Sequence, residues 1–434
     1  MKRALIITYY WPPAGGAGVY RWLKFTKHMH KFGWQPVIYT PSNPAVAATD
    51  RSLLNDVTKE TEILKYPIFE PLDLYKFFNR KNLNIGAGLL TSKKTAGWKS
   101  KLLFWFRGNF FIPDPRKFWI KPSVKFLRNY LKHKPVDVII STGPPHSMHL
   151  IALKLSQILD IKWVADFRDP WTNIDFYNQL KLTRIADKKN KRLEQKVLKS
   201  ANIITTVSNS WATEFIHLGA GEVEVITNGF DQEEFSSSLK KTNTNFTITH
   251  IGSMNQDRNP AILWQTLAEL LDEDPRLKDI LEIKLIGDVD FRVFESVKSN
   301  GLSENLVHIP YMEHKKVIEV LQLSSVLLLP LNNTPNVLGI IPGKLFEYLA
   351  AKKPIIAIGP ENGDTAVILN ETKSGTTINY TDKEKLAATL KILYEKYKSG
   401  DIKQMTDDSK AEKYSRANLC KDFCVLLDKL TQNN

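Results

Sequence analysis

Short apolar runs alternate with amphipathic segments along most of the 434-residue chain, and this pattern predicts two series of strands and helices. In the first series, buried-strand patterns lie at 3–8, 36–40, 136–141, 161–165, 202–207 and 223–226. In the second series, they lie at 246–251, 281–286, 306–309, 325–329, 354–358 and 376–379. Because strands that alternate with helices pair in parallel, we predict an α/β protein with two doubly wound, Rossmann-like sheets.

A polar stretch without periodicity, 236–245, separates the two series and indicates a linker. The chain is too long for a single hydrophobic core, so a division is expected. We predict a first domain at 1–235, a second domain at 246–410 and a C-terminal helix at 411–434. The first domain is the candidate packing partner of that helix.

The composition, 43% apolar and 24% charged residues, is typical of soluble globular proteins. No apolar run reaches the roughly 18 residues that span a bilayer. The apolar run near the N-terminus ends at Pro12 and Pro13, too early for a signal peptide. The only cysteines, Cys420 and Cys424, lie four residues apart, and no Cys/His cluster has zinc spacing. We therefore expect a cytoplasmic protein without a disulfide framework.

The net charge of +14 is concentrated in the segment 76–134. This segment contains 15 Lys or Arg, a single acid, Asp114, and 12 aromatic residues, so the rest of the chain has no net charge. Interleaved cations and rings are typical of proteins at an anionic membrane surface. Nucleic-acid binding and a loop whose rings pack into the domain are the alternatives. We predict membrane contact and no nucleic-acid partner, because no nucleic-acid module is recognisable.

Candidate binding residues follow three strands of the first series. They are a glycine-rich loop, a histidine and two aspartates: Gly15, Gly16, Gly18, His146, Asp166 and Asp169. The glycines let the backbone approach a phosphate or sugar closely, although their spacing differs from the dinucleotide fingerprint. Ligands of parallel sheets bind outside the carboxyl ends of the strands, so we expect these loops to line a site.

The stretch Asn336–Gly359 predicts an anion site in the second series. Gly343 precedes an apolar helix and leaves backbone amides open at its start, where the helix dipole favours an anion. Lys344 adds positive charge there, and Glu347 lies one turn later, where a carboxylate suits sugar hydroxyls. A solvated Lys–Glu pair in an ordinary αβ unit is the alternative.

Together these features resemble glycosyltransferase family 4, whose members are retaining, sugar-nucleotide-dependent enzymes. The resemblance covers nearly the whole chain and rests on motifs at 15–18, 142–145, 166–171, 228–231, 250–253 and 342–348. It implies the GT-B architecture, in which two Rossmann-like domains face each other across a cleft. It also implies a donor pocket in the second domain and an acceptor site in the first.

The resemblance implies a donor-binding set of Gly15, Gly16, Gly18, Asn228, Gly252, Arg258, Gly343, Lys344 and Glu347. Glu347 matches the family's second glutamate, which holds the ribose hydroxyls. The family's first glutamate falls at Gly339, and this departure alters how the donor sugar is recognised. We expect Arg258 and Lys344 to clamp the diphosphate, so that no metal or other cofactor is required.

The acceptor hydroxyl must lose a proton, either to the leaving phosphate or to His146, Asp166 or Asp169. The alternative for the aspartates is a scaffolding pair with Arg168, and for His146 a helix cap. We predict a transferase that moves a sugar to a lipid-linked or polysaccharide acceptor in cell-surface glycan biosynthesis, at the inner face of the plasma membrane. A sugar-nucleotide 2-epimerase and a non-catalytic sugar-nucleotide-binding protein are the alternatives, the latter favoured by Gly339.

Overall fold

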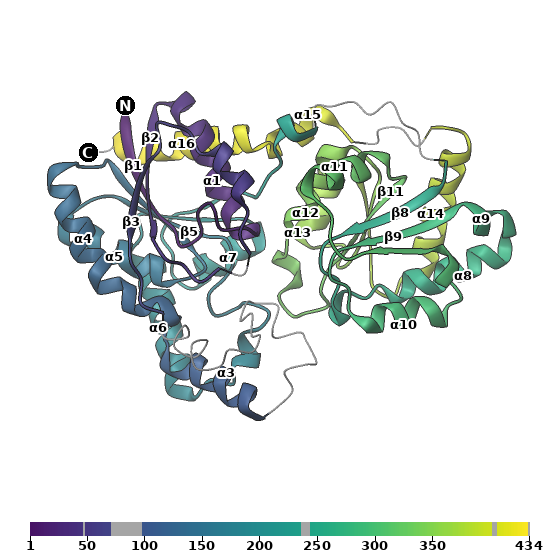
Figure 1. The fold of residues 1–434 in the computed structure, drawn as a ribbon, viewed down its shortest axis with the longest axis horizontal. Coiled ribbons are helices and arrows are strands. Elements are labelled where there is room, and N and C mark those ends of the chain that lie inside the picture. Colours follow the sequence, from purple (N-terminus) through teal and green to yellow (C-terminus); the bar gives the residue numbers. More distant parts are fainter. Residues whose placement is uncertain (47, 71–97, 236–243, 402–405, 433–434) are drawn as a thin grey trace. The chain divides into compact units, whose positions relative to one another are not determined.

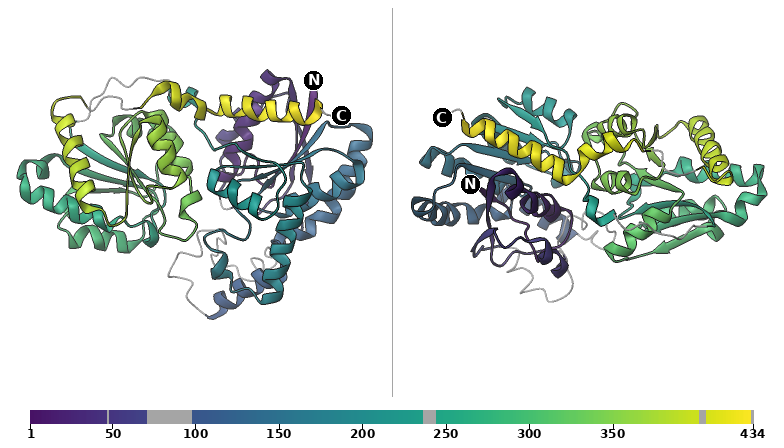
Figure 2. Two further views of the ribbon diagram at one scale, coloured as in Figure 1. Left: turned by 180° about the vertical axis from the view of Figure 1, so that it is seen from behind. Right: turned by 90° about the horizontal axis from the view of Figure 1, so that it is seen from above.

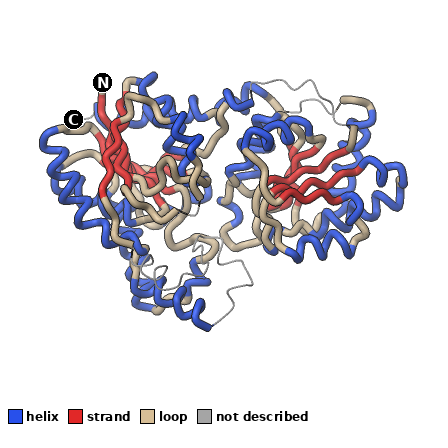
Figure 3. Tube along the Cα trace, in the orientation of Figure 1, coloured by secondary structure: helices blue, strands red, loops and turns tan. Residues whose placement is uncertain are grey.

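The computed structural model describes residues 1–46, 48–70, 98–235, 244–401 and 406–432 (Figure 1). The chain forms two compact units, one of Met1–Thr227 with Arg416–Asn434 and one of Asn228–Ser415. Each unit contains one sheet with helices against it (Figure 3), and the strands within each sheet pair in parallel. The predicted α/β class with two parallel sheets is confirmed.

The sheet of the first unit has seven strands in the order β3-β2-β1-β4-β5-β6-β7. The strands are β1 Lys2–Ile7, β2 Trp34–Pro41, β3 Glu62–Tyr66, β4 Val138–Gly143, β5 Trp163–Phe167, β6 Ile203–Thr206 and β7 Val223–Val225. The strand order reverses between β1 and β4, so the loops that follow these two strands diverge and leave room for a ligand there. The pattern missed β3, an edge strand that is only partly buried.

The helices of the first unit are α1 Ala17–Met29, α3 Trp98–Phe110, α4 Ile120–His133, α5 Ser147–Leu159, α6 Arg184–Ser200, α7 Asn209–His217 and α16 Arg416–Gln432. The last helix, α16, lies against α1 (Figure 2). The ring centroids of Phe423 and Trp22 lie 5.3 Å apart, and the Cys420 thiol donates to the Phe25 carbonyl at 3.3 Å. Both cysteines are free and buried, so they act as core residues.

The sheet of the second unit has six strands in the order β10-β9-β8-β11-β12-β13. They are β8 Phe246–Ile251, β9 Leu281–Ile286, β10 Leu306–Ile309, β11 Val326–Pro330, β12 Ile355–Ile358 and β13 Gly375–Ile378. The helices are α8 Ala261–Glu273, α9 Pro275–Ile280, α10 Phe291–Ser299, α11 His314–Leu323, α12 Gly343–Ala351, α13 Asp364–Thr372, α14 Lys383–Lys398 and α15 Asp408–Ala411.

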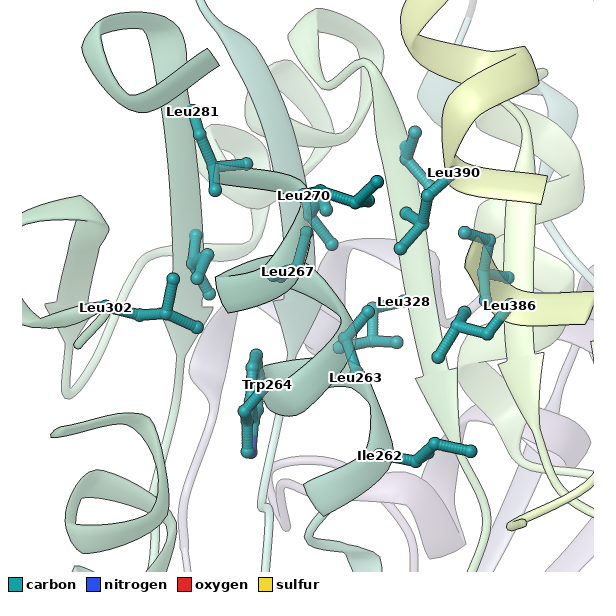
Figure 4. Close-up of a cluster of buried hydrophobic side chains, with 14 of the residues drawn as sticks. Ile262, Leu263, Trp264, Leu267, Leu270, Leu281, Leu302, Leu328, Leu386 and Leu390 are labelled. Atoms are coloured by element: carbon teal, nitrogen blue, oxygen red, sulfur yellow. The ribbon is translucent and has the colours of Figure 1, made fainter. Parts of the chain in front are cut away.

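One apolar core of the second unit lies beneath α8 and α14 (Figure 4). Trp264 and Leu267 of α8 pack in the same cluster as Leu386 and Leu390 of α14, and all four are buried. Full burial of one such side chain contributes about 1.5 to 3 kcal/mol, so this layer holds the helices firmly on the sheet.

The unit boundaries differ from those predicted. The first unit ends at Thr227 rather than at 235, and it also includes the last segment of the chain, from Arg416 onward. Within the predicted basic segment, 76–97 lies outside the described residues, and 98–134 forms α3, α4 and the 3-10 turn Pro115–Trp119. Trp119 is fully buried and stacks on Tyr39 at 4.8 Å, so part of the segment is ordinary core. In the part of the chain described, no helix is long and apolar enough to cross a bilayer.

Candidate active site

The start of α12 in the second unit presents a cation without a hydrogen-bonded partner among the described residues. Lys344 forms no hydrogen bond or ion pair with any residue that the structure describes. Its side chain lies across Gly252, where an added Cβ would overlap Cε and Nζ, and Gly252 has a left-handed φ of 101°. A Cβ added at Gly343 would meet no atom within 4 Å, so the approach to the first amides of the helix is open. These features suit an anionic ligand.

Burial and the neighbouring Arg258 lower the pKa of Lys344 to about 8, while Glu347 opposes the shift. Arg258 is oriented by its Nε, which donates to Asn332 Oδ1 at 2.7 Å, and by its Nη1, which donates to the Ser253 carbonyl at 3.3 Å. Two cations are thus held close enough to repel each other. A bound diphosphate would relieve this repulsion, because it places negative charge between them.

Two buried side chains tie the anion site to the sheet. The Tyr348 hydroxyl accepts from the Ile251 amide at 3.0 Å and lies 3.4 Å from the Leu328 carbonyl. His250 Nδ1 lies 3.0 Å from the same carbonyl. Burial and the Lys344 charge lower the pKa of His250 to about 3, so this ring stays neutral and adds no further positive charge.

The loop between β11 and α12 contains Gly339, which is buried in the turn Val337–Gly339. Thr365 Oγ1 donates to the Ile340 carbonyl at 2.8 Å, and the Tyr380 hydroxyl donates to the Asn332 carbonyl at 3.0 Å. The loop is therefore anchored by other parts of the second unit. Glu347 lies half-buried on α12, one turn after Lys344.

The pKa of Lys344 leads to a pH-dependent affinity. We expect nucleotide-sugar binding to weaken as the pH rises from about 7 to about 9, because the anion binds the charged ammonium, which is lost above its pKa of about 8. Binding near pH 8 should take up a proton, measurable by calorimetry in two buffers of different ionisation enthalpy. Lys344→Arg keeps its charge and should remove the proton uptake. Equal enthalpies in both buffers for the wild type would contradict this account.

In the first unit, the glycine-rich loop is shaped by close packing. Gly16 has a left-handed φ of 95° and precedes α1, and the Gly15 amide donates to the Ala48 carbonyl at 2.9 Å. A Cβ at Gly18 would lie 2.9 Å from the Tyr10 ring and 3.3 Å from Arg168 Nη1. Gly18 is needed for this approach; a ligand role for the three glycines stays a prediction.

Arg168 joins the loops that follow β1, β4 and β5. Its guanidinium donates to the carbonyls of Gly18 at 2.8 Å, Gly143 at 3.2 Å and Pro144 at 2.6 Å. Each contact is a charged hydrogen bond to a backbone carbonyl. The sequence suggested Arg168 only as a partner of the aspartates. It could not show this role, because the carbonyls that Arg168 binds lie far from it in the chain.

Asp166 lies inside β5 rather than after it, and its carboxylate is saturated. The donors are Arg21 Nη2 at 2.9 Å and Nε at 3.3 Å, Trp22 Nε1 at 2.9 Å, Thr142 Oγ1 at 2.8 Å and Thr205 Oγ1 at 3.0 Å. Although burial alone raises the pKa of Asp166, the Arg21 guanidinium and these hydrogen bonds hold it below its usual value. The contacts suit a scaffolding role with Arg21, not Arg168, as the paired cation.

The side chains of His146 and Asp169 form no hydrogen bond with the described residues. His146 immediately precedes α5 and stacks on the Trp171 indole at 4.7 Å. Burial, His149 and Arg168 lower the pKa of His146 well below its usual value, so the ring is neutral and a weaker base than an exposed histidine. Asp169 is half-buried, and burial raises its pKa against the effect of Arg168. Their catalytic roles stay predictions.

The remaining donor-set residue, Asn228, is the first residue of the second unit. Two residues later, the Phe230 amide donates to the Tyr414 carbonyl at 3.1 Å, so the outgoing and returning chain segments lie side by side. The second unit thus places Gly252, Arg258, Gly343 and Lys344 close together, as a candidate anion site. The first unit gathers the loops that carry Gly18, Gly143 and Arg168.

Comparisons with known proteins bear directly on both units. The family model for Glycosyltransferase Family 4 matches residues 93–234, and the model for glycosyl transferases group 1 matches residues 231–410, which include the anion site. Together the two matches span residues 93–410 and identify the chain as a glycosyltransferase. It is a nucleotide-sugar-dependent glycosyltransferase, as the motifs predicted. A comparison with curated protein sequences found no match.

Solved structures share the fold of this glycosyltransferase over its whole length. Sucrose-phosphate synthase from Thermosynechococcus elongatus has a TM-score of 0.66 at 12% identity, with 100% of each chain covered. HepE from Anabaena, solved with UDP, has a TM-score of 0.60 at 14% identity, covering 100% of this chain and 98% of its own. TarM from S. aureus, solved with fondaparinux, alpha-GlcNAc-glycerol and UDP, has a TM-score of 0.62 at 11% identity. The match covers 99% of this chain and 100% of the TarM chain. The GT-B fold is confirmed.

Proposed function

We propose that the glycosyltransferase moves a sugar, with retention, from a nucleotide-sugar to a hydroxyl of a lipid-linked or polysaccharide acceptor in cell-surface glycan biosynthesis. The observation that carries the donor half is the uncompensated Lys344 beside Arg258 at the open start of α12. Family neighbours solved with UDP support a diphosphate ligand of this kind.

Lys344 and Arg258 would act on the leaving group. The bond between the anomeric carbon and the phosphate oxygen breaks, the bond to the acceptor oxygen forms, and negative charge collects on the diphosphate. A donor aimed at such charge typically contributes about 3 to 4 kcal/mol to the transition state. Two side-chain cations and the amides of α12 would provide this stabilisation without a metal ion, as predicted from the motifs.

The acceptor proton needs a recipient on the first unit or on the donor itself. His146 is neutral and next to the Arg168-bound loop, while Asp169 has a raised pKa from burial, opposed by Arg168. Either side chain, or an oxygen of the leaving phosphate, would accept this proton. Asp166 is the weakest candidate because five hydrogen bonds already occupy its carboxylate.

A panel of UDP-, GDP- and ADP-sugars tests the proposal, with nucleotide release measured with and without lipid-linked or polysaccharide acceptors. Release that requires an acceptor supports transfer, and the configuration of the product's anomeric carbon decides retention. An isomerised donor without release would instead identify a 2-epimerase. Binding without turnover across the panel would identify a non-catalytic binding protein.

Glu347→Ala is expected to weaken nucleotide-sugar binding about tenfold or more, because loss of a hydrogen bond to a charged group costs roughly 1.5 to 3 kcal/mol. Titration calorimetry measures the effect. Glu395→Ala, which changes an exposed glutamate of α14 in the same unit, is the matched control and should bind normally. Unchanged affinity of Glu347→Ala would show that the ribose is held elsewhere.

A further inference from the structure

The first unit exposes a group of large apolar side chains on α3 and the turn that follows it. Their exposed fractions are 54% for Leu102, 36% for Trp105, 44% for Phe106, 53% for Phe110 and 43% for Phe118. The rings touch one another: Phe106 stacks on Phe110 at 4.4 Å. We call these five residues the aromatic surface. An exposed apolar cluster of this kind marks an interaction site.

The helix α6 presents cations beside the aromatic surface. Its exposed Lys and Arg residues are Arg184, Lys188, Lys189, Lys191, Arg192, Lys196 and Lys199. At 3.6 residues per turn they fall on one side of the helix, opposite the buried Ala186, Asn190 and Val197. Lys191 pairs with Asp187, but the other six form no ion pair with the described residues. Ile185, 82% exposed, lies among them.

The cationic side of α6 and the aromatic surface are continuous. The helices α3 and α6 are in contact and lie side by side (Figures 1 and 2). The Thr183 amide, which precedes α6, donates to Asn109 Oδ1 on α3 at 2.7 Å. Lys117 Nζ lies 5.1 Å from the centre of the Phe118 ring, and burial and the charge of Lys189 lower the pKa of Lys117. Cations therefore border the exposed rings directly.

We propose that α3 and α6 together dock the glycosyltransferase on an anionic lipid bilayer. The rings and Ile185 would enter the headgroup layer, and the unpaired cations of α6 would contact lipid phosphates. Each Lys or Arg at an anionic surface raises binding by about fivefold, so six unpaired cations suffice for stable attachment. Exposed aliphatic side chains between the cations favour a bilayer over nucleic acid, which offers no hydrocarbon to Leu102 or Ile185.

The docking surface is linked to the acceptor side of the site. Asp114, in the turn after α3, accepts from the Ser147 amide and from Ser147 Oγ, both at 2.9 Å. Ser147 directly follows His146. If sugar transfer occurs as proposed above, this link brings the acceptor hydroxyl to His146 from the bilayer surface, so the substrate class is an amphiphile embedded in the membrane.

Vesicle co-sedimentation of the full chain tests the surface without reference to catalysis. The variant Lys188→Glu, Lys189→Glu, Arg192→Glu is compared with Lys298→Glu, Lys315→Glu, Lys316→Glu, which reverses three exposed lysines of the second unit. On vesicles with phosphatidylglycerol, the α6 variant should lose at least about tenfold in binding, and the control should change less than about threefold. Wild-type binding should fall with added salt. Equal loss in both variants would overturn the proposal.

Phe106→Ser and Phe110→Ser test the aromatic part with the charge unchanged. Together they should reduce binding to the same vesicles severalfold while leaving nucleotide-sugar binding at the wild-type value, which also shows that the protein is folded. Tight binding of a single-stranded oligonucleotide, lost in the α6 variant, with no vesicle binding by the wild type would identify nucleic acid instead. Vesicle binding with equal turnover of soluble and lipid-linked acceptors would retain the docking surface but reject the embedded acceptor.

Discussion

Replacing Lys344 by methionine is expected to weaken nucleotide-sugar binding by about 100-fold and, at the same time, to stabilise the fold. The loss follows because an ammonium on a diphosphate contributes roughly 1.5 to 3 kcal/mol, and each 1.4 kcal/mol is a factor of ten. Titration calorimetry measures the affinity, and thermal unfolding without ligand measures the stability. Affinity should fall while stability rises, because the Lys344 ammonium stabilises the bound ligand and destabilises the unliganded fold.

The expected stabilisation follows from the sign of the pKa shift. The pKa of Lys344 is about 8 in the folded protein, whereas an unfolded lysine has a pKa of about 10.4. Between these values the unfolded chain binds more protons, so this residue makes wild-type stability rise with pH across that window. At neutral pH the buried charge costs at most about 3 kcal/mol, which Lys344→Met removes.

The matched control is Lys391→Met, on the exposed side of α14 in the same unit, where the lysine pairs with Glu273 at the surface. Its stability should change by less than about 0.5 kcal/mol, and its nucleotide affinity should not change. If Lys344→Met bound nucleotide-sugars like the wild type, the anion site would lie elsewhere. If it were destabilised, the ammonium would have a partner that stabilises it.

Replacing Asp166 by alanine is expected to cost about 3 to 5 kcal/mol of folding free energy, because it leaves the Arg21 guanidinium buried without its carboxylate. The Arg21 side chain is only 2% exposed and that of Asp166 is not exposed. Arg21 Nη1 also donates to the Thr227 carbonyl at 2.8 Å, at the end of the first unit, so its displacement would disturb that boundary. Urea unfolding measures the cost.

A double-mutant cycle and the pH dependence sharpen this test. Asp166→Ala combined with Arg21→Met should be more stable than Asp166→Ala alone, because the guanidinium that lost its carboxylate is removed as well. Since the folded pKa of Asp166 lies below the unfolded value of about 3.9, its contribution is complete at neutral pH and is lost as the pH falls below about 4.

Asp166→Asn separates scaffolding from catalysis, because it keeps the shape and removes the charge. If Asp166 only supports the fold, transfer activity per folded molecule should stay at the wild-type value. Lost turnover at unchanged stability and unchanged nucleotide affinity would instead restore Asp166 as a proton acceptor. Asp169→Asn, which alters a half-buried carboxylate without a hydrogen bond to the described residues, is the comparison.

Short segments rich in β-branched residues and leucine predicted the strands of the second unit well. The predicted strands 246–251, 281–286 and 306–309 coincide with β8, β9 and β10. These residue types favour strands locally, so the sequence suffices to find them even in β9 and β10, which are only partly buried. The basic segment was harder, because exposed cations and rings surround the buried Ile120, Leu127 and Leu131 of α4 and obscure its apolar face.

The sequence alone determined three things: the resemblance to glycosyltransferases, the alternation of strands and helices, and the position of Lys344 at a helix start. Each depends on neighbouring residues in the chain. The tertiary structure decided which charges are compensated. Asp166 is bound by side chains from α1, β4 and β6, whereas Lys344 lies uncompensated beside Arg258. A protonation state depends on burial and on charges a few ångströms away, and the fold alone brings those groups together.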